Sequence, residues 1–191
     1  MFRLSLFVLM FSVLAFYPSS SRASDADYVI LPGDVLQITV WKEEGMDQEI
    51  VVLPSGAFTF PLIGTLNAKG KKPSVLKDEI LERLKPFIQE ASVTVTVKAP
   101  LGHKVSVIGE VLEPGDVLLS SETSITQAIS QSGGFTPYAD QGDILVIRRN
   151  EDGVKEKIEF SFSRFSKGRS LEDDIDLKPG DVVVVPASGL F

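Results

Sequence analysis

Residues 105–138 decide the fold of this chain, and they read VSVIGEVLEPGDVLLSSETSITQAISQSGGFTPY. The stretch begins with alternation, because Val105 and Val107 place their side chains on one face of an extended segment. A Pro-Gly-Asp turn at 114–116 then supplies a proline already near the φ of a turn and a glycine that can take positive φ. The pattern predicts a hairpin whose second short strand lies at 117–119.

A short helix is predicted to follow the hairpin. Ser124 precedes Gln127 by three residues, the spacing of a capping box in which each side chain binds the other residue's backbone N–H. Gly133 and Gly134 are expected to end the helix, because the left-handed position after a helix favours a residue without Cβ. Three apolar residues share one stripe of this helix: Ile125, Ala128 and Ile129. The stretch is thus one compact unit of hairpin, capped helix and double-glycine stop.

Upstream of this unit, the sequence predicts a small β-sheet. Residues 35–41 combine alternation with β-branched side chains, and 49–53 and 57–62 read as further strands. A tight turn at 54–56 joins the last two, which predicts a β-meander. Residues 93–97 alternate between valine and threonine, so we expect them to close the sheet.

An amphipathic helix is expected to cover one face of that sheet. Pro73 suits the first position of a helix, and Pro86 should end or kink the helix near its last turn. The apolar stripe of this helix is Leu76, Ile80, Leu84 and then Phe87 or Ile88. Residues 99–103 read as a short linker.

Beyond the opening unit, residues 143–148 and 154–162 predict a second hairpin. The polar stretch 163–174 should cross over to a last strand at 182–186. Phe160, Phe162 and Phe165 are interpreted as core residues rather than as a platform for sugar rings.

The tripeptide Pro-Gly-Asp occurs three times, beginning at Pro32, Pro114 and Pro179, and a valine follows each copy. The spacing is irregular, so we interpret the copies as turns that lead into strands and not as a solenoid repeat or a ligand motif. The elements together predict an α+β fold: a small β-sheet domain with one covering helix, then a second, mostly β domain.

Several segments resemble one known family. GEVLEPGD at 109–116 and SITQAISQSGGFT at 124–136 resemble the soluble-ligand-binding β-grasp module of bacterial polysaccharide export proteins. PGDVLQITVW at 32–41 and PSGAFTFPLIG at 54–64 resemble the polysaccharide export domain of that family, and DVVVVP at 181–186 resembles its closing strand. One departure is visible at Ser55, where the family usually has aspartate; serine makes the same local turn bond more weakly.

After a signal peptide expected at 1–23, the resemblance implies a polysaccharide export domain at 24–99 and a soluble-ligand-binding β-grasp domain at 104–191. In the family, such proteins form rings that make a periplasmic passage for the polymer and dock onto an inner-membrane copolymerase. Larger relatives add further β-grasp modules and a C-terminal amphipathic helix. Since little sequence follows Pro186, we expect this chain to form a short periplasmic ring or to work with a separate outer-membrane partner, and not to make an outer-membrane pore alone.

The first residues have the pattern of a cleaved secretory signal peptide. Arg3 is the positive region, 4–17 is an apolar run of roughly 14 residues, and 21–23 reads Ser-Arg-Ala at the cleavage site. The run is shorter than the about 20 residues that span a bilayer. An uncleaved anchor remains the alternative.

The chain contains no cysteine, so it has no disulfide, no thiolate metal site and no cysteine to carry an N-terminal lipid. Many family members are lipoproteins, and this chain departs from that pattern. The chain has 19 basic and 26 acidic residues. Removal of Arg3 and Arg22 with the leader leaves 17 basic residues against 26 acidic ones, so the net charge becomes −9. Nucleic acid is therefore not an expected partner, because phosphate binding needs a basic surface.

No catalytic, cofactor-binding or metal-binding residues are predicted. His103 is the only histidine and is interpreted as an exposed loop residue, without a nucleophile nearby in sequence. Asp173, Asp174 and Asp176 are the densest acidic cluster, which a solvated loop explains better than a pair of catalytic carboxylates.

Five residues are candidate contacts for a partner or a ligand. Ser132, Gly133 and Gly134 end a helix, so they are not a phosphate loop, which would begin one. Arg148 and Arg149 close a strand and could meet an acidic partner surface.

The leading hypothesis is a non-catalytic component of exopolysaccharide or capsule export in the periplasm, with any association with the outer membrane made through partners. It would form or cap an oligomeric passage for polysaccharide. The alternative is a monomeric periplasmic protein whose β-grasp module binds a soluble sugar. A wall-remodelling hydrolase is a third hypothesis, for which the sequence offers no residues.

Overall fold

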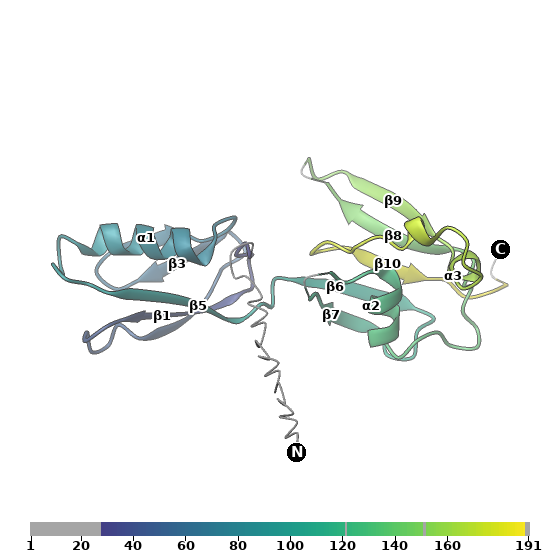
Figure 1. Ribbon diagram of the computed structural model, residues 1–191, viewed down its shortest axis with the longest axis horizontal. Coiled ribbons are helices and arrows are strands. Elements are labelled where there is room, and N and C mark those ends of the chain that lie inside the picture. Colours follow the sequence, from purple (N-terminus) through teal and green to yellow (C-terminus); the bar gives the residue numbers. More distant parts are fainter. Residues whose placement is uncertain (1–27, 121, 151, 190–191) are drawn as a thin grey trace, which may run out of the picture.

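The computed structural model describes residues 28–120, 122–150 and 152–189, and the expected signal peptide lies outside these ranges. The chain forms two lobes, one after the other along the sequence (Figure 1). We call residues 28–99 the N-terminal lobe and residues 104–189 the C-terminal lobe. Each has its own sheet and its own cluster of buried apolar side chains, and the class is α+β, as predicted.

The sheet of the N-terminal lobe has the strand order β2-β1-β5, built from β1 (Val35–Val40), β2 (Gln48–Val51) and β5 (Val93–Ala99). Both neighbours are antiparallel to β1. Alternation in β1 buries Leu36, Ile38 and Val40 and leaves Gln37 and Thr39 on the opposite face. One face of the sheet is therefore apolar and the other polar.

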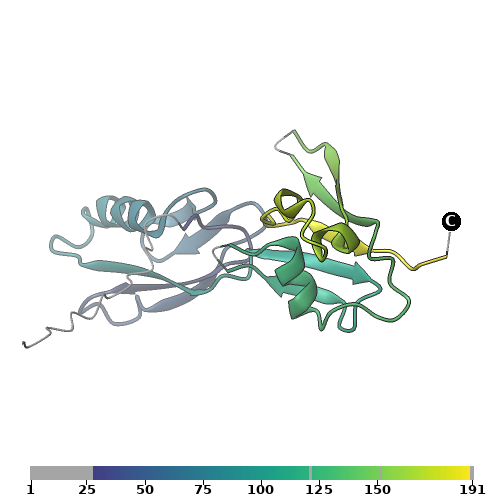
Figure 2. The ribbon, with the colours of Figure 1, turned by 45° about the vertical axis from the view of Figure 1, so that its right-hand side comes forward.

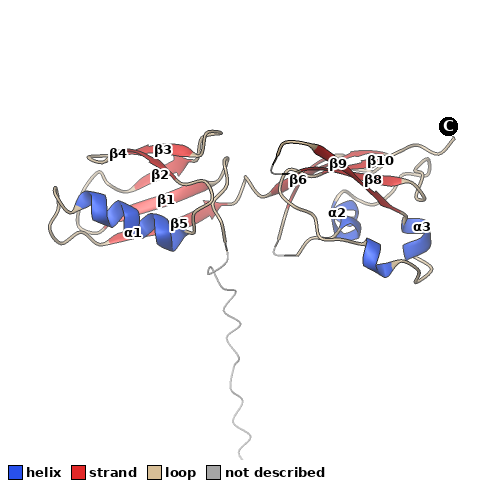
Figure 3. Cartoon of the chain, turned by 90° about the horizontal axis from the view of Figure 1, so that it is seen from above, coloured by secondary structure: helices blue, strands red, loops and turns tan. Residues whose placement is uncertain are grey.

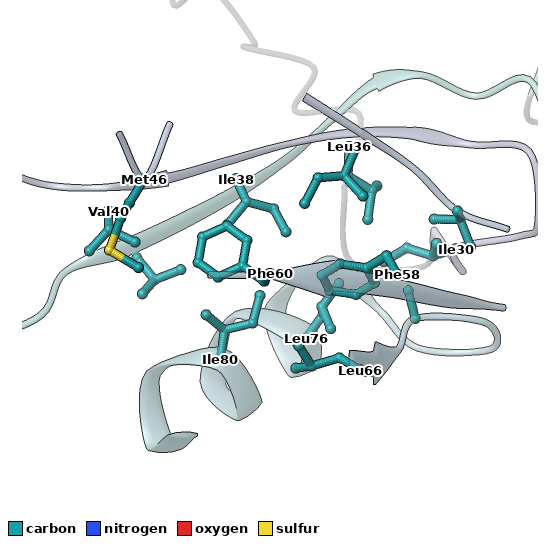
Figure 4. Packing of buried hydrophobic residues seen from close by; sticks show 14 of the residues in the cluster. Ile30, Leu36, Ile38, Val40, Met46, Phe58, Phe60, Leu66, Leu76 and Ile80 are labelled. Carbon is teal, nitrogen blue, oxygen red and sulfur yellow. The ribbon is translucent and has the colours of Figure 1, made fainter. Parts of the chain in front are cut away.

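The predicted meander is wrong in one respect. Strand β3 (Ala57–Phe60) does not continue the sheet but pairs with β4 (Gly64–Asn67) in a separate hairpin. After a tight turn in which the Gly56 N–H donates to the Leu53 carbonyl, β3 leaves the plane of the sheet and packs on its apolar face. Phe58 and Phe60 drive this arrangement, because both side chains are buried between the sheet and a helix (Figure 4).

That helix is α1 (Pro73–Leu84), which begins at a proline and ends before Pro86, as predicted. Its buried residues are Leu76, Ile80 and Leu84, and Ile88 beyond it also packs against the same cluster. Helix α1 and the β3–β4 hairpin thus cover one face of the sheet (Figure 1).

The C-terminal lobe holds a mixed sheet of five strands in the order β7-β6-β10-β8-β9. The strands are β6 (Lys104–Gly109), β7 (Gly115–Leu118), β8 (Ile144–Arg149), β9 (Lys155–Phe160) and β10 (Val182–Val185). The last strand lies in the middle, parallel to β6 and antiparallel to β8. This is the strand arrangement of a β-grasp module.

Helix α2 (Ile125–Gln131) lies on one face of this sheet with the short helix α3 (Phe162–Phe165) (Figure 3). The predicted capping box is present, since the Ser124 hydroxyl accepts from the Gln127 N–H and the Gln127 side chain accepts from the Ser124 N–H. The predicted stop is also present, because Gly133 and Gly134 have φ of 78° and 85°. The Gly134 N–H donates to the Ile129 carbonyl and the Gly133 N–H to the Ser130 carbonyl, which together form a Schellman motif.

The strand predicted at 154–162 ends earlier, at Phe160, and the chain then turns into α3. The reason is packing: with helical spacing, Phe162 and Phe165 both reach the buried cluster that contains Phe160. Their rings lie close to those of Phe135 and Phe160, at centroid separations of 4.9 and 5.9 Å respectively. The interpretation of the three phenylalanines as core residues is confirmed. The rest of the polar crossing contains a turn of 3₁₀-helix, η1 (Leu171–Asp173).

Candidate functional site

Two of the three Pro-Gly-Asp turns are built alike. At each, the residue before proline and the aspartate bond to each other twice: the Asp34 N–H donates to the Leu31 carbonyl at 3.1 Å, and the Leu31 N–H donates to Asp34 Oδ2 at 2.8 Å. Lys178 and Asp181 repeat these bonds at 3.0 and 2.8 Å. The glycines have φ of 97° and 87°, as a type II turn requires. The prediction that these turns lead into strands is confirmed, and both aspartates are buried.

The third copy differs. Gly115 is the first residue of β7, and Asp116 lies on the surface, where it accepts from Lys104 and Ser106. The identical tripeptides therefore have two roles, and only the structure separates them.

Asp34 also holds the linker between the lobes. Its Oδ2 accepts from the Tyr28 hydroxyl at 2.7 Å, and its Oδ1 accepts from the Gly102 N–H at 2.8 Å. A Cβ on Gly102 would lie 2.6 Å from the Pro32 carbonyl oxygen, so a larger residue does not fit there. Burial, and then the bond to Asp34, raise the pKa of Tyr28 well above its usual value.

His103 lies in the same cluster, so its interpretation as an exposed loop residue is wrong. Its ring packs against that of Tyr28, with centroids 4.6 Å apart and planes tilted by 36°, and Nε2 lies 3.0 Å from the Val29 carbonyl oxygen. The side chain is 21% exposed, and Nε2 is 3.8 Å from Asp34 Oδ2. The linker is thus tied to the start of the N-terminal lobe by both backbone and side chains.

Arg148, one of the five predicted contact residues, is bound to other residues of the C-terminal lobe. It forms a bidentate ion pair with buried Asp181, from Nε to Oδ1 at 3.0 Å and from Nη2 to Oδ2 at 2.7 Å. Its Nη2 also donates to the Asp176 carbonyl. The hydrogen bond with Asp181 raises the pKa of Arg148. Arg149, by contrast, is exposed and donates to the Gly153 carbonyl across the hairpin turn.

The other three predicted contacts lie at the end of α2. Ser132 is buried, and no hydrogen-bond partner for its hydroxyl is found among the described residues. Its carbonyl accepts from the Glu113 N–H, and the Gly134 carbonyl accepts from the Leu112 N–H. In the same region, the Glu110 N–H donates to the Val185 carbonyl at the end of β10. Arg148 instead bonds to Asp181, just before the beginning of β10. The structure therefore does not gather the five residues into one site.

The acidic cluster has a structural task that sequence reasoning missed. Asp174 accepts from the Thr126 N–H at 3.0 Å and from the Thr126 hydroxyl at 2.7 Å, in the first turn of α2. A carboxylate at this position accepts from a backbone N–H that has no partner within the helix. Its negative charge is also stabilised by the positive end of the helix dipole. Across residues 28–120, 122–150 and 152–189, no group of three His, Asp or Glu side chains could hold a metal ion.

Two surfaces of the N-terminal lobe stand out. The uncovered face of its sheet is polar, with Gln37 and Thr39 bound to Asp47 and with Thr94 and Thr96 exposed beside them. Trp41, the only tryptophan, follows at the end of β1 and is 67% exposed.

The second surface is an open groove between the outer edge of β5 and the first half of α1. It is lined by Tyr28, Pro73, Ser74, Lys77 and the segment 95–97. In the part of the chain that the structure describes, no helix has the length and apolar character to cross a membrane.

Comparisons with known proteins agree with the two-lobe division in sequence. A family model described as "Polysaccharide biosynthesis/export protein" matches residues 22–98, and a model of the SLBB domain matches residues 103–185. EPS I polysaccharide export outer membrane protein EpsA of Ralstonia solanacearum is 33% identical over 98 residues, which is 50% of this chain and 26% of that protein.

EpsA of Ralstonia nicotianae is 26% identical over 151 residues, covering 66% of this chain and 40% of the relative. Polysialic acid transport protein KpsD of Escherichia coli is 26% identical over 124 residues, covering 64% of this chain and 22% of the relative. The chain thus spans between 22% and 40% of the length of these curated relatives. On the two matched models and these relatives, the chain is similar to bacterial polysaccharide export proteins over most of the residues that the structure describes.

Proposed function

We propose that this protein is a non-catalytic component of exopolysaccharide or capsule export that assembles with copies of itself into a periplasmic passage. The observation that carries the proposal is the pairing of an export-type lobe and a β-grasp lobe through a linker clamped by Asp34. In the described ranges, neither lobe has a group of three His, Asp or Glu side chains that could hold a metal ion. Such a pair acts by shape, and it suits a structural part of a machine better than an enzyme.

The proposal includes cleavage of the leader at 1–23, an export domain at 24–99 and a β-grasp domain at 104–191. The partners would be polysaccharide, an inner-membrane copolymerase and a separate outer-membrane protein. The relatives are named for export of EPS I and transport of polysialic acid, which supports a polysaccharide as the cargo.

Deletion of the gene tests this function. Secreted or capsular polysaccharide should fall strongly in the deletion strain while the glycan accumulates inside the cell, and the wild-type gene on a plasmid should restore export. An unchanged amount of secreted glycan, or turnover of a glycan by the purified protein, would contradict the proposal.

A monomeric sugar-binding protein is the second candidate, favoured by exposed Trp41 beside the polar sheet face. An indole ring offers an apolar surface to a sugar ring, and hydroxyl and amide groups offer hydrogen bonds. Calorimetric titration of the purified monomer with oligosaccharides distinguishes the two: saturable binding without assembly supports this candidate, and assembly without saturable binding supports the first.

A further inference from the structure

The outer edge of β5 is open. Strand β5 has seven residues, and within the described ranges β1 is its only partner strand. Its core reads Val-Thr-Val-Thr-Val at 93–97, without proline, glycine or an inward-pointing charge. Natural proteins normally blunt such an edge, because its free N–H and C=O groups pair readily with another strand.

The register shows which backbone groups face outward. The Trp41 N–H donates to the Ser92 carbonyl, so this pair belongs to the hydrogen-bonded set of the antiparallel β1–β5 ladder. The pairs alternate along the ladder, so Thr94 and Thr96 direct their backbone groups at β1. Val95 and Val97 therefore direct theirs outward, and both line the groove beside α1. A helix beside an open edge leaves a slot for an extended segment.

The opposite edge of the same sheet is formed by β2 and can be analysed in the same way. The Val52 N–H donates to the Asp34 carbonyl, which makes 34 and 52 a hydrogen-bonded pair. By alternation, Glu49 and Val51 direct their backbone groups away from β1. Their side chains lie on the polar face, whereas those of Val95 and Val97 lie on the covered face.

This difference in faces selects one way of joining two copies. In a parallel pair of strands, a residue forms its backbone hydrogen bonds to two residues of the other strand whose side chains lie on the opposite face of the sheet. In an antiparallel pair, the side chains of two hydrogen-bonded residues lie on the same face. The side chains of Val95 and Glu49 lie on opposite faces, so only parallel pairing keeps the covered faces of the two sheets on the same side. Strands β2 and β5 also run in the same direction, because each is antiparallel to β1.

Charge is complementary between the two edges. The β2 edge follows an acidic loop with Glu43, Glu44 and Asp47 and carries Glu49 itself, all exposed. The β5 edge carries Lys98, and Lys77 of α1 lines its groove, with Asp78 3.4 Å from the ammonium. Lys98 already pairs with Glu49 of its own chain across β1. Glu49 of a second copy would lie on the strand directly beside it.

We propose that β5 of one copy pairs in parallel with β2 of a second copy, so that the sheets of successive N-terminal lobes join head to tail. The inference rests on the self-assembly in the proposed function and names its surface. Head-to-tail contacts of this kind close into rings or continue as open rows. Pairing of β5 with β5 about a two-fold axis is disfavoured, because it would bring two Lys77 side chains into one groove.

Val95→Pro tests the edge, because it removes an outward N–H and leaves the β1 ladder bonded. Self-association of the purified mature protein, measured by sedimentation equilibrium, should weaken at least about tenfold. Lys157→Pro is the matched control: register places its N–H outward on β9, the edge strand of the C-terminal lobe, so assembly should be unchanged. Circular dichroism and thermal melting must show that both variants fold.

A mixing experiment separates the contact between copies from the pair within one copy. Glu49→Lys and Lys98→Glu should each weaken self-association, since each leaves like charges at the joint. An equimolar mixture of the two variants should restore it, because the introduced glutamate of one copy then meets the introduced lysine of the other at one joint, and the native pair forms at the next. The pair within each copy stays repulsive in that mixture, so a purely internal role predicts no restoration.

The proposal is overturned if the wild-type protein stays monomeric at millimolar concentration or if Val95→Pro assembles normally. Normal assembly of Glu49→Lys would also overturn it, because that result favours pairing of β5 with β5. These outcomes leave the deletion phenotype untouched, so export could stand while the joint fails. A deletion strain with normal secreted glycan would instead refute the export function while the joint stands.

Discussion

At the scale of single residues, neighbours in sequence have unlike roles. Arg148 and Arg149 look equivalent in the sequence, yet only Arg148 reaches Asp181, which lies 33 positions away in the chain. Such a pair cannot be read from the sequence, because it depends on β10 inserting next to β8. The tripeptides that begin at 32 and 179 gave a usable signal, since an aspartate after Pro-Gly favours a closed turn. Their further partners, Tyr28 and Arg148, gave none.

Arg148→Ala should destabilise the C-terminal lobe by about 3–5 kcal/mol, because it leaves the buried Asp181 carboxylate without its cation. Arg149→Ala removes an exposed neighbour of the same type and should change the free energy of unfolding by less than about 0.5 kcal/mol. Urea unfolding monitored by circular dichroism measures both. Equal effects of the two variants would show that the Asp181 pair does not stabilise the fold.

At the scale of elements, local patterns predicted the ends of helices well and the ends of strands less well. Capping box, double-glycine stop and Pro73 are local chemistry, so each could be recognised from a few residues. Strand β4 was missed because Leu66 is its one buried residue, which leaves no alternation to detect. The strand predicted to reach 162 ends at Phe160, because packing of the phenylalanines favoured helical spacing there over continued extension.

Gly133→Ala should cost about 1–2 kcal/mol, because its φ of 78° is unfavourable for a residue with Cβ, and a Cβ would lie 3.0 Å from Leu112 Cβ. Gly115→Ala is the matched control, since that glycine has no positive φ and its Cβ would meet nothing within 4 Å. It should be neutral or slightly stabilising. Chemical denaturation curves that rank the two variants in the opposite order would refute the role given to the helix stop.

At the scale of the whole molecule, the linker is the part that sequence reasoning described least well. Residues 99–103 read as a plain connection, but Gly102 and His103 pack against the start of the N-terminal lobe. The signal was present only in part, as a lone glycine and a lone histidine. Their partners lie about 70 residues earlier, at separations of 68 and 74 positions for the two contacts. Figure 2 shows from a second side how the two lobes follow one another along the chain.

Tyr28→Phe should destabilise the N-terminal lobe by about 1–3 kcal/mol near neutral pH, because Asp34 loses a buried hydrogen-bond donor. Tyr138→Phe, at a residue 72% exposed, is the control and should have little effect.

The pKa of Tyr28 is raised in the folded state, so the contribution of Tyr28 to stability is complete below the ordinary value of 10.0 and is lost as pH rises above it. The difference between wild type and Tyr28→Phe should therefore shrink as pH rises above about 10. A difference that stays constant between about pH 9 and 12 in urea titrations would contradict the clamp.

The uncovered face of the N-terminal sheet has a consequence for how a polymer would travel. Helix α1 and the β3–β4 hairpin thicken one side of the sheet. In the proposed row of joined lobes, curvature with that side outward would turn the bare face inward. The inner wall would then repeat Gln37, Thr39, Thr94 and Thr96 in every copy, with Glu49 and Val51 of β2 on the same face. Short polar side chains on such a wall would exchange hydrogen bonds with water and with sugar hydroxyls at similar energies, so between the exposed Trp41 side chains a chain of sugars would meet no preferred resting place. Throughput would follow the rate at which new polymer is pushed in, and sugar sequence would matter little.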